Sequence, residues 1–100
     1  MNTIASLKQE FANIDKLRMF EIEVLNKETQ ETDYIIFDIK LVKNTLIAKH
    51  ESLTKKQEKS NKVSFVKVTL DKYFSLDANL EALYDECINA ILNSEFFELI

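Results

Sequence analysis

The segment SLDANLEALYDECINAIL, residues 75–92, carries the clearest structural signal in the sequence. Its apolar side chains recur at spacings of three and four residues, which places them on one face of an α-helix. They are Leu76, Leu80, Leu83, Tyr84, Cys87, Ile88, Ile91 and Leu92. Ser75 or Asp77 can cap the start, because a short polar side chain accepts a hydrogen bond from a free backbone N–H there. The pattern predicts a long amphipathic helix.

Upstream of this helix, the apolar period changes from 3.6 to two, which is typical of half-buried strands. In RMFEIEVL, residues 18–25, the shared face holds Phe20, Ile22 and Val24. In YIIFDIKLV, residues 34–42, the inner face holds Ile35, Phe37, Ile39 and Leu41. In KVSFVKVTL, residues 62–70, one face holds Val66, Val68 and Leu70. Residues 26–32 and 52–61 are polar and are predicted to be connections.

Lys43 and Asn44 separate two strand-like runs, and two interpretations remain open for residues 34–53. The pair can form a two-residue hairpin turn with Asn44 in the left-handed conformation. Alternatively, the whole stretch is one long bent strand. Short polar connections favour antiparallel pairing in either case.

Residues 2–15 read as a first helix, because Ile4, Leu7, Phe11 and Ile14 form one apolar stripe. Ser6 with Gln9 can form its capping box, and Thr3 is the earlier alternative. We therefore expect a single α+β domain over residues 1–100. It consists of an N-terminal helix, a three- or four-stranded antiparallel sheet and a long C-terminal helix, with both helices on one sheet face.

The chain contains no glycine and no proline. Loops that cradle phosphate and dinucleotide fingerprints need glycine, so the sequence excludes both. Turns must use other residues, and asparagine tolerates positive φ best among those that remain. The candidates for positive φ are Asn26, Asn44, Asn61 and Asn93.

Catalytic and metal chemistry find little support in the residues. One histidine and one cysteine cannot form a structural zinc site of those residue types alone. His50 and Cys87 are conceivable as a base and a nucleophile, but Cys87 lies within the apolar stripe of the helix and reads as a small core residue. We expect no catalytic site, no cofactor and no metal.

Charge is segregated along the chain. Residues 39–72 carry nine lysines against three acids, a net charge of +6, and residues 73–100 carry six acids and no lysine or arginine. On the C-terminal helix, Asp77, Glu81 and Asp85 are spaced i, i+4 and i+8, and such like charges repel one another. Lysines of the sheet or a basic partner can offset this repulsion, so these acids are candidate partner-binding residues.

The lysines of the middle segment define a second candidate surface, the basic patch of Lys55, Lys56, Lys59 and Lys62. Such a patch can contact phosphates, so nucleic-acid binding is one alternative function. The overall net charge of −4, a single arginine and the lack of an aromatic-interleaved motif argue against nucleic acid as the partner.

The chain given finishes on the apolar segment SEFFELI, residues 94–100. Phe96 and Leu99 extend the helical stripe, whereas Phe97 and Ile100 do not. If the segment leaves the helix near Asn93, alternation pairs Phe97 with Leu99 instead. In both cases one apolar pair lies off the core, so we assign Phe97 and Ile100 to partner binding and expect a homodimer.

These observations favour a non-catalytic protein-binding module. The class we favour is a small antagonist acting through a charged surface, meaning an immunity protein, an antitoxin or a viral inhibitor of a host enzyme. The alternative is a chaperone or adaptor that binds extended segments by strand addition. One cysteine, no apolar run long enough to span a membrane and no signal-peptide pattern predict a cytoplasmic protein without membrane contact.

Overall fold

The computed structural model describes residues 3–14, 18–51 and 65–100. These form an α+β fold of two helices and five strands. In chain order the elements are α1 (Ile4–Ala12), β1 (Met19–Asn26), β2 (Thr32–Val42), β3 (Thr45–Glu51), β4 (Phe65–Thr69), α3 (Leu76–Asn93) and β5 (Phe97–Leu99). The strands make one antiparallel sheet in the order β4-β3-β2-β1-β5.

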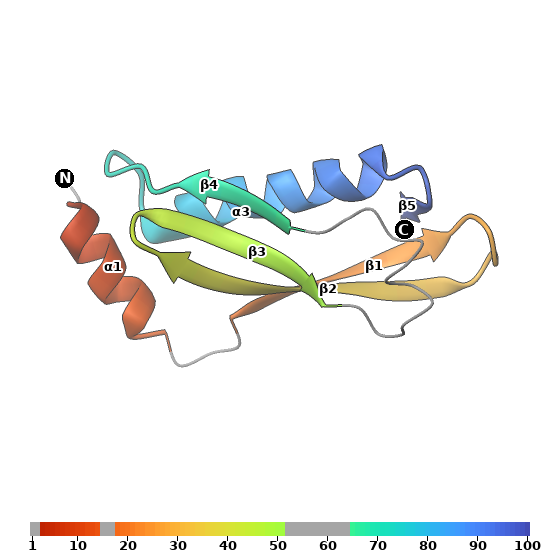
Figure 1. The fold of residues 1–100 in the computed structure, drawn as a ribbon, viewed down its shortest axis with the longest axis horizontal. Coiled ribbons are helices and arrows are strands. Elements are labelled where there is room, and N and C mark those ends of the chain that lie inside the picture. The colour runs from red at the N-terminus through yellow and green to blue at the C-terminus, as the bar shows by residue number, and fades with distance from the viewer. Residues whose placement is uncertain (1–2, 15–17, 52–64) are drawn as a thin grey trace.

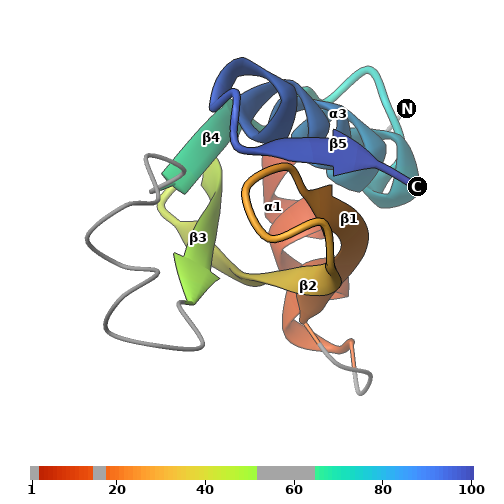
Figure 2. The same ribbon diagram turned by 90° about the vertical axis from the view of Figure 1, so that its right-hand side faces the viewer.

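The sheet is curled, so its two outer strands approach the same helix from opposite sides (Figures 1 and 2). α3 packs against β3, β4 and β5 and lies along the open side of the curl. α1 packs against α3 at the end of the molecule that carries the β2–β3 turn (Figure 1). The packing of helices on the sheet agrees with the expected arrangement of both helices on one sheet face, but the placement differs in detail because the sheet curls around α3.

The core lies inside the curl, between the inner face of the sheet and the two helices. Alternation along β2 is as predicted, with Ile35, Phe37 and Ile39 buried. The residues that are fully buried come from every layer, and the largest are Phe37, Leu7, Leu46, Leu83, Ile91, Val24 and Cys87. The helices and strands predicted from the apolar periods therefore pack their inner faces into one hydrophobic cluster.

The fifth strand is the main departure from the prediction of three or four strands. α3 ends at Asn93, and Glu95 takes φ 65°, which turns the chain back along β1. β5 then pairs with β1, with Phe97 opposite Asn26 and Leu99 opposite Val24. Of the two interpretations of residues 94–100, the helical continuation through Phe96 and Leu99 is wrong, and the extended one is confirmed.

The described part of residues 34–53, up to Glu51, follows the hairpin interpretation, because β2 and β3 pair from Ile36 to Val42 around a two-residue loop. The residue with positive φ is Lys43, at 56°, and not Asn44. A positive φ at the first loop residue alone is the sign pattern of a type II′ turn.

Of the asparagines proposed for positive φ, Asn61 lies outside the described residues, and none of the others takes it. The described residues with positive φ are Gln30, Lys43 and Glu95. Asn26 stabilises its turn differently, since its side-chain oxygen accepts hydrogen bonds from the N–H groups of Glu28 and Thr29.

α1 begins one turn earlier than the Ser6–Gln9 capping box would place it. Thr3 is the N-cap, and its side chain accepts a hydrogen bond from the Ser6 N–H at 3.0 Å. The Ser6 hydroxyl in turn accepts one from the Thr3 N–H at 2.9 Å. The alternative with Thr3 is therefore the correct one, and serine takes the place that glutamate or glutamine usually holds in such a box.

Candidate protein-binding surface

The start of α3 is fixed by two short polar side chains. Ser75 is the N-cap, and its hydroxyl accepts a hydrogen bond from the Ala78 N–H at 3.1 Å. One turn further on, the buried amide of Asn79 bonds to the main chain of the loop before the helix, including the Asp71 N–H at 2.8 Å and the Ser75 carbonyl at 2.8 Å. These bonds hold the loop and the helix in one orientation without glycine or proline.

The apolar stripe determines which face of α3 remains exposed. Leu76, Leu83, Cys87 and Ile91 are buried, so the opposite side of the helix faces solvent. Tyr84 lies at the border of the stripe, 38% exposed, with its ring edge-on to Phe20 of β1 at a centroid distance of 5.2 Å. The sequence pattern placed Tyr84 with the core and missed that its ring also belongs to the surface.

Asp77, Glu81 and Asp85 are all exposed on α3, as their spacing predicts. None of the three carboxylates has a salt bridge or side-chain hydrogen bond to another residue of the described chain. Asp77 lies in the first turn, where the helix dipole favours a negative charge. Glu81 and Asp85 lack that compensation, and the described lysines of the sheet do not supply a counter-charge. The three residues, with Tyr84, are called the acidic face below.

The two tail residues assigned to partner binding have different positions. Phe97 is only 7% exposed and packs in the core from β5, so its expected position off the core is wrong. Ile100 is 67% exposed, and Leu99 and Leu92 are 41% and 46% exposed. The exposed apolar group at this end of the molecule is thus Ile100 with Leu99 and Leu92, rather than Phe97 with Ile100.

The basic patch of Lys55, Lys56, Lys59 and Lys62 lies outside the described residues. The lysines expected on strands, Lys40, Lys43, Lys49 and Lys67, are exposed, and Lys43 lies in the β2–β3 turn rather than on a strand. Lys49 of β3 stands directly opposite Asp38 of β2, so part of this basic charge faces an acid within the sheet. Nucleic-acid binding through the middle segment stays a prediction.

Cys87 and His50, considered above as a nucleophile and a base, occupy different environments. Burial, and secondarily the charge of Glu86, raises the pKa of the Cys87 thiol to about 12. The thiol is protonated at neutral pH and is a weak nucleophile. His50 lies on β3 opposite Phe37, with a distance of 5.8 Å between the two ring centroids.

No group of three or more histidine, cysteine, aspartate or glutamate side chains is arranged to hold a metal ion in the described part of the chain. Neither described helix is long and apolar enough to cross a membrane.

Comparisons of the chain with protein-family models, with curated proteins and with solved structures gave no match.

Proposed function

We propose that this chain is a non-catalytic protein-binding module whose acidic face captures a basic surface on a partner protein. One observation carries the proposal: Glu81 and Asp85 lie one helical turn apart, exposed, with no counter-charge among the described residues. Like charges at this spacing are unfavourable by a few tenths of a kcal/mol, and a partner's cations would relieve the repulsion. The acids therefore contribute more to a complex than to the free fold.

Tyr84 adds a partly exposed aromatic ring to the charged surface of the acidic face. Its ring is held in place by the edge-on contact with Phe20, yet part of it remains exposed at the edge of the acidic face, one helical turn after Glu81. Tyrosine is enriched among residues that dominate binding energy, because a rigid ring loses little entropy on association. An exposed ring among carboxylates suits lysine or arginine side chains, which contact aromatic faces as well as acids.

The class of protein that fits this surface is a small antagonist, such as an immunity protein, an antitoxin or a viral inhibitor of a host enzyme. A protein of this kind acts by occupying a complementary surface and needs no catalytic group. Charge complementarity accelerates encounter between the two proteins and disfavours wrong partners.

A capture experiment tests the proposal. The wild-type chain and the variant E81Q/D85Q are immobilised and exposed to extract of the cells that produce the protein. The matched control E21Q/E23Q removes two exposed acids from β1 and so makes the same change in net charge. We expect one partner to bind the wild type and the control but not E81Q/D85Q, and to elute as salt is raised. A partner retained equally by all three contradicts the proposal.

Strand addition at β4 is the second candidate. β4 is an outer strand of the described sheet, and Phe65 on its outer face is 57% exposed. An extended segment bound there would be held by main-chain hydrogen bonds and would resist salt. Retention of the partner at high salt, with loss on introducing proline at Lys67, would favour this mode over the acidic face.

A homodimer through the exposed apolar group remains part of the proposal. Sedimentation of the wild type and of L99S/I100S measures it, since both side chains are exposed in the single chain. A wild type that is monomeric at high micromolar concentration excludes the homodimer.

A further inference from the structure

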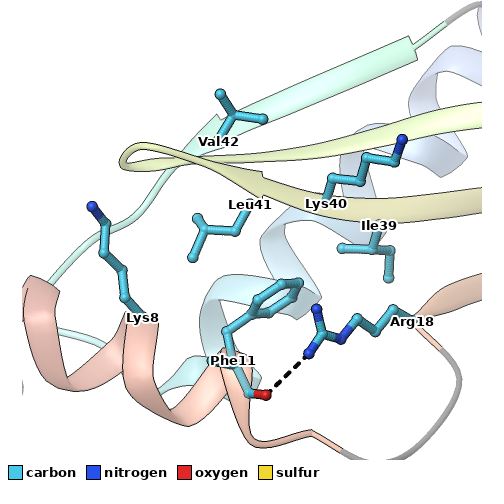
Figure 3. A pocket seen from close by; sticks show the side chains of 8 residues that line it. Lys8, Phe11, Arg18, Ile39, Lys40, Leu41 and Val42 are labelled. Carbon is cyan, nitrogen blue, oxygen red and sulfur yellow. Dashed lines mark hydrogen bonds between the residues drawn. The ribbon is translucent and has the colours of Figure 1, made fainter.

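A cleft of ≈ 410 Å³ opens between α1 and the end of β2 (Figure 3). Its described lining comprises Lys8, Phe11, Ala12, Arg18, Ile39, Lys40, Leu41 and Val42. The volume falls within the range of ligand pockets. The cleft lies on elements other than the acidic face, so what it binds is independent of the function proposed above.

The cleft combines an apolar floor with a cationic rim. Phe11 and Leu41 point into it from α1 and β2 (Figure 3). Lys8 and Arg18 stand on opposite sides of Leu41, and Lys40 lies on the rim with its ammonium group directed away from Phe11 (Figure 3). The lining described by the structure includes no acidic residue. None of the three cations has a salt bridge to a described acid, so their charge is available to a ligand.

Arg18 is held in place before any ligand arrives. One of its terminal nitrogens donates a hydrogen bond to the Ala12 carbonyl at the end of α1, at 3.2 Å. The central carbon of its guanidinium lies 4.7 Å from the centroid of the Phe11 ring. Guanidinium carries five N–H donors in a planar fork, so most of them remain free after this single bond. A fixed fork loses little side-chain entropy when it binds an anion.

The dimensions of the cleft favour a small molecule over a peptide. Its α1 wall extends only from Lys8 to Ala12, roughly 6 Å at the rise of an α-helix. An extended peptide rises about 3.3 Å per residue, so only about two residues would contact that wall.

We infer that this cleft binds a small organic anion in which a carboxylate is joined to a short apolar group. The carboxylate takes the free N–H groups of Arg18, with Lys8 adding attraction. The apolar group covers Leu41, the half-buried side chain of the cleft, which lies beside the buried ring of Phe11. Charge and apolar area are both needed, so a small acid without the apolar group, or an apolar compound without the charge, binds more weakly.

Titration of the ¹⁵N-labelled chain with octanoate, acetate and 1-octanol tests the inference by NMR. Octanoate at millimolar concentration is expected to give saturable shifts at residues 8–12, 18 and 39–42. The affinities of acetate and 1-octanol are each expected to be lower than that of octanoate by roughly tenfold or more. The inference is overturned if octanoate gives no saturable shifts, if the shifts lie elsewhere, or if 1-octanol binds as tightly as octanoate.

Variants separate the cleft from general charge effects. R18Q and K8Q should each weaken octanoate binding, by roughly tenfold for R18Q. K49Q, which removes an exposed lysine of β3 outside the cleft, should leave it unchanged. Because R18Q also removes the contact with Ala12 and can loosen α1, K8Q provides the same test without touching a described hydrogen bond. Equal binding by K8Q and K49Q would overturn the inference. Since E81Q/D85Q should bind octanoate as the wild type does, the two proposals fail independently.

Discussion

Asn79 of α3 and Asp71 of the preceding loop are joined by two hydrogen bonds. The side-chain oxygen of Asn79 accepts from the Asp71 N–H at 2.8 Å, and its amide nitrogen donates to the Asp71 carbonyl at 3.0 Å. The same nitrogen also donates to the carbonyls of Phe74 and Ser75. Asn79 is 4% exposed, and it is the one buried polar residue of the described chain.

Replacement of Asn79 by alanine should therefore lower the free energy of unfolding by about 1–3 kcal/mol, because the loop's main-chain groups would lose their partners. Urea denaturation followed by circular dichroism measures the change. N89A, at an exposed position of the same helix, is the control and should stay within about 0.5 kcal/mol of wild type. Equal effects of the two substitutions would show that the Asn79 bonds do not stabilise the fold.

The buried face of α3 should be the most sensitive part of the core. Leu83 has no exposed surface, so L83A should destabilise by about 2–5 kcal/mol through lost burial and the cavity that remains. Ile88, which is half-buried, should lose less on truncation to alanine. Leu92 is 46% exposed and serves as the control. Denaturant midpoints and slopes of the three variants check the order, and a loss below about 1 kcal/mol for L83A would contradict it.

Periodicity predicted the elements whose apolar face is long enough to be unambiguous. Residues 34–42 and 76–92 each repeat their pattern several times, and both became elements of the predicted type. β5 has only three residues, and the apolar side chains in and beside it fit two patterns: Phe96 and Leu99 continue the helical stripe, whereas Phe97 and Leu99 alternate as in a strand. Its pairing with β1 depends on a contact distant in sequence, which local spacing does not encode.

The two candidate sites also differ in how far the sequence alone predicts them. The spacing of Asp77, Glu81 and Asp85 on one helix is local, so the sequence predicts their shared exposure. The cleft brings Lys8 of α1 and Arg18 before β1 together with Leu41 of β2, and only the fold places these three segments side by side. The one arginine of the chain, directly before a strand, was the available signal.

The turn after α3 offers a way to stabilise the protein. Glu95 adopts φ 65° at the position after the C-cap Ser94, where glycine is most common because it has no Cβ. E95G should raise the free energy of unfolding by up to about 1 kcal/mol, since relief of the left-handed strain exceeds the entropy cost of glycine. K49G, in the middle of β3, should destabilise instead. Thermal unfolding of both variants decides, and a lower midpoint for E95G would contradict the prediction.

The acids of α3 should have opposite effects on stability according to their position. E81Q/D85Q should leave the free energy of unfolding unchanged or raise it by a few tenths of a kcal/mol at low salt, because it removes a repulsion. D77N should lower it by about 0.3–1 kcal/mol, because Asp77 interacts favourably with the helix N-terminus. Both effects should shrink as salt is added. Destabilisation by E81Q/D85Q would mean that these acids stabilise the fold through pairs of their own.

Cys87 should make stability depend on pH in the alkaline range. Burial, with a smaller contribution from Glu86, raises the pKa of its thiol from 9.0 to about 12 in the folded chain. Below pH 9 the thiol is protonated in both states and has no effect on the pH dependence. Between pH 9 and 12 the unfolded chain releases the proton and the folded chain keeps it, so stability falls as pH rises, by at most about 1.4 kcal/mol per pH unit.

The variant C87A lacks this loss of stability. The difference in unfolding free energy between wild type and C87A, measured from pH 7 to 11, should therefore be constant to about pH 9 and then decline. The comparison cancels the tyrosines and lysines, which titrate in both proteins. A difference that stays constant throughout would show that the thiol ionises equally in both states.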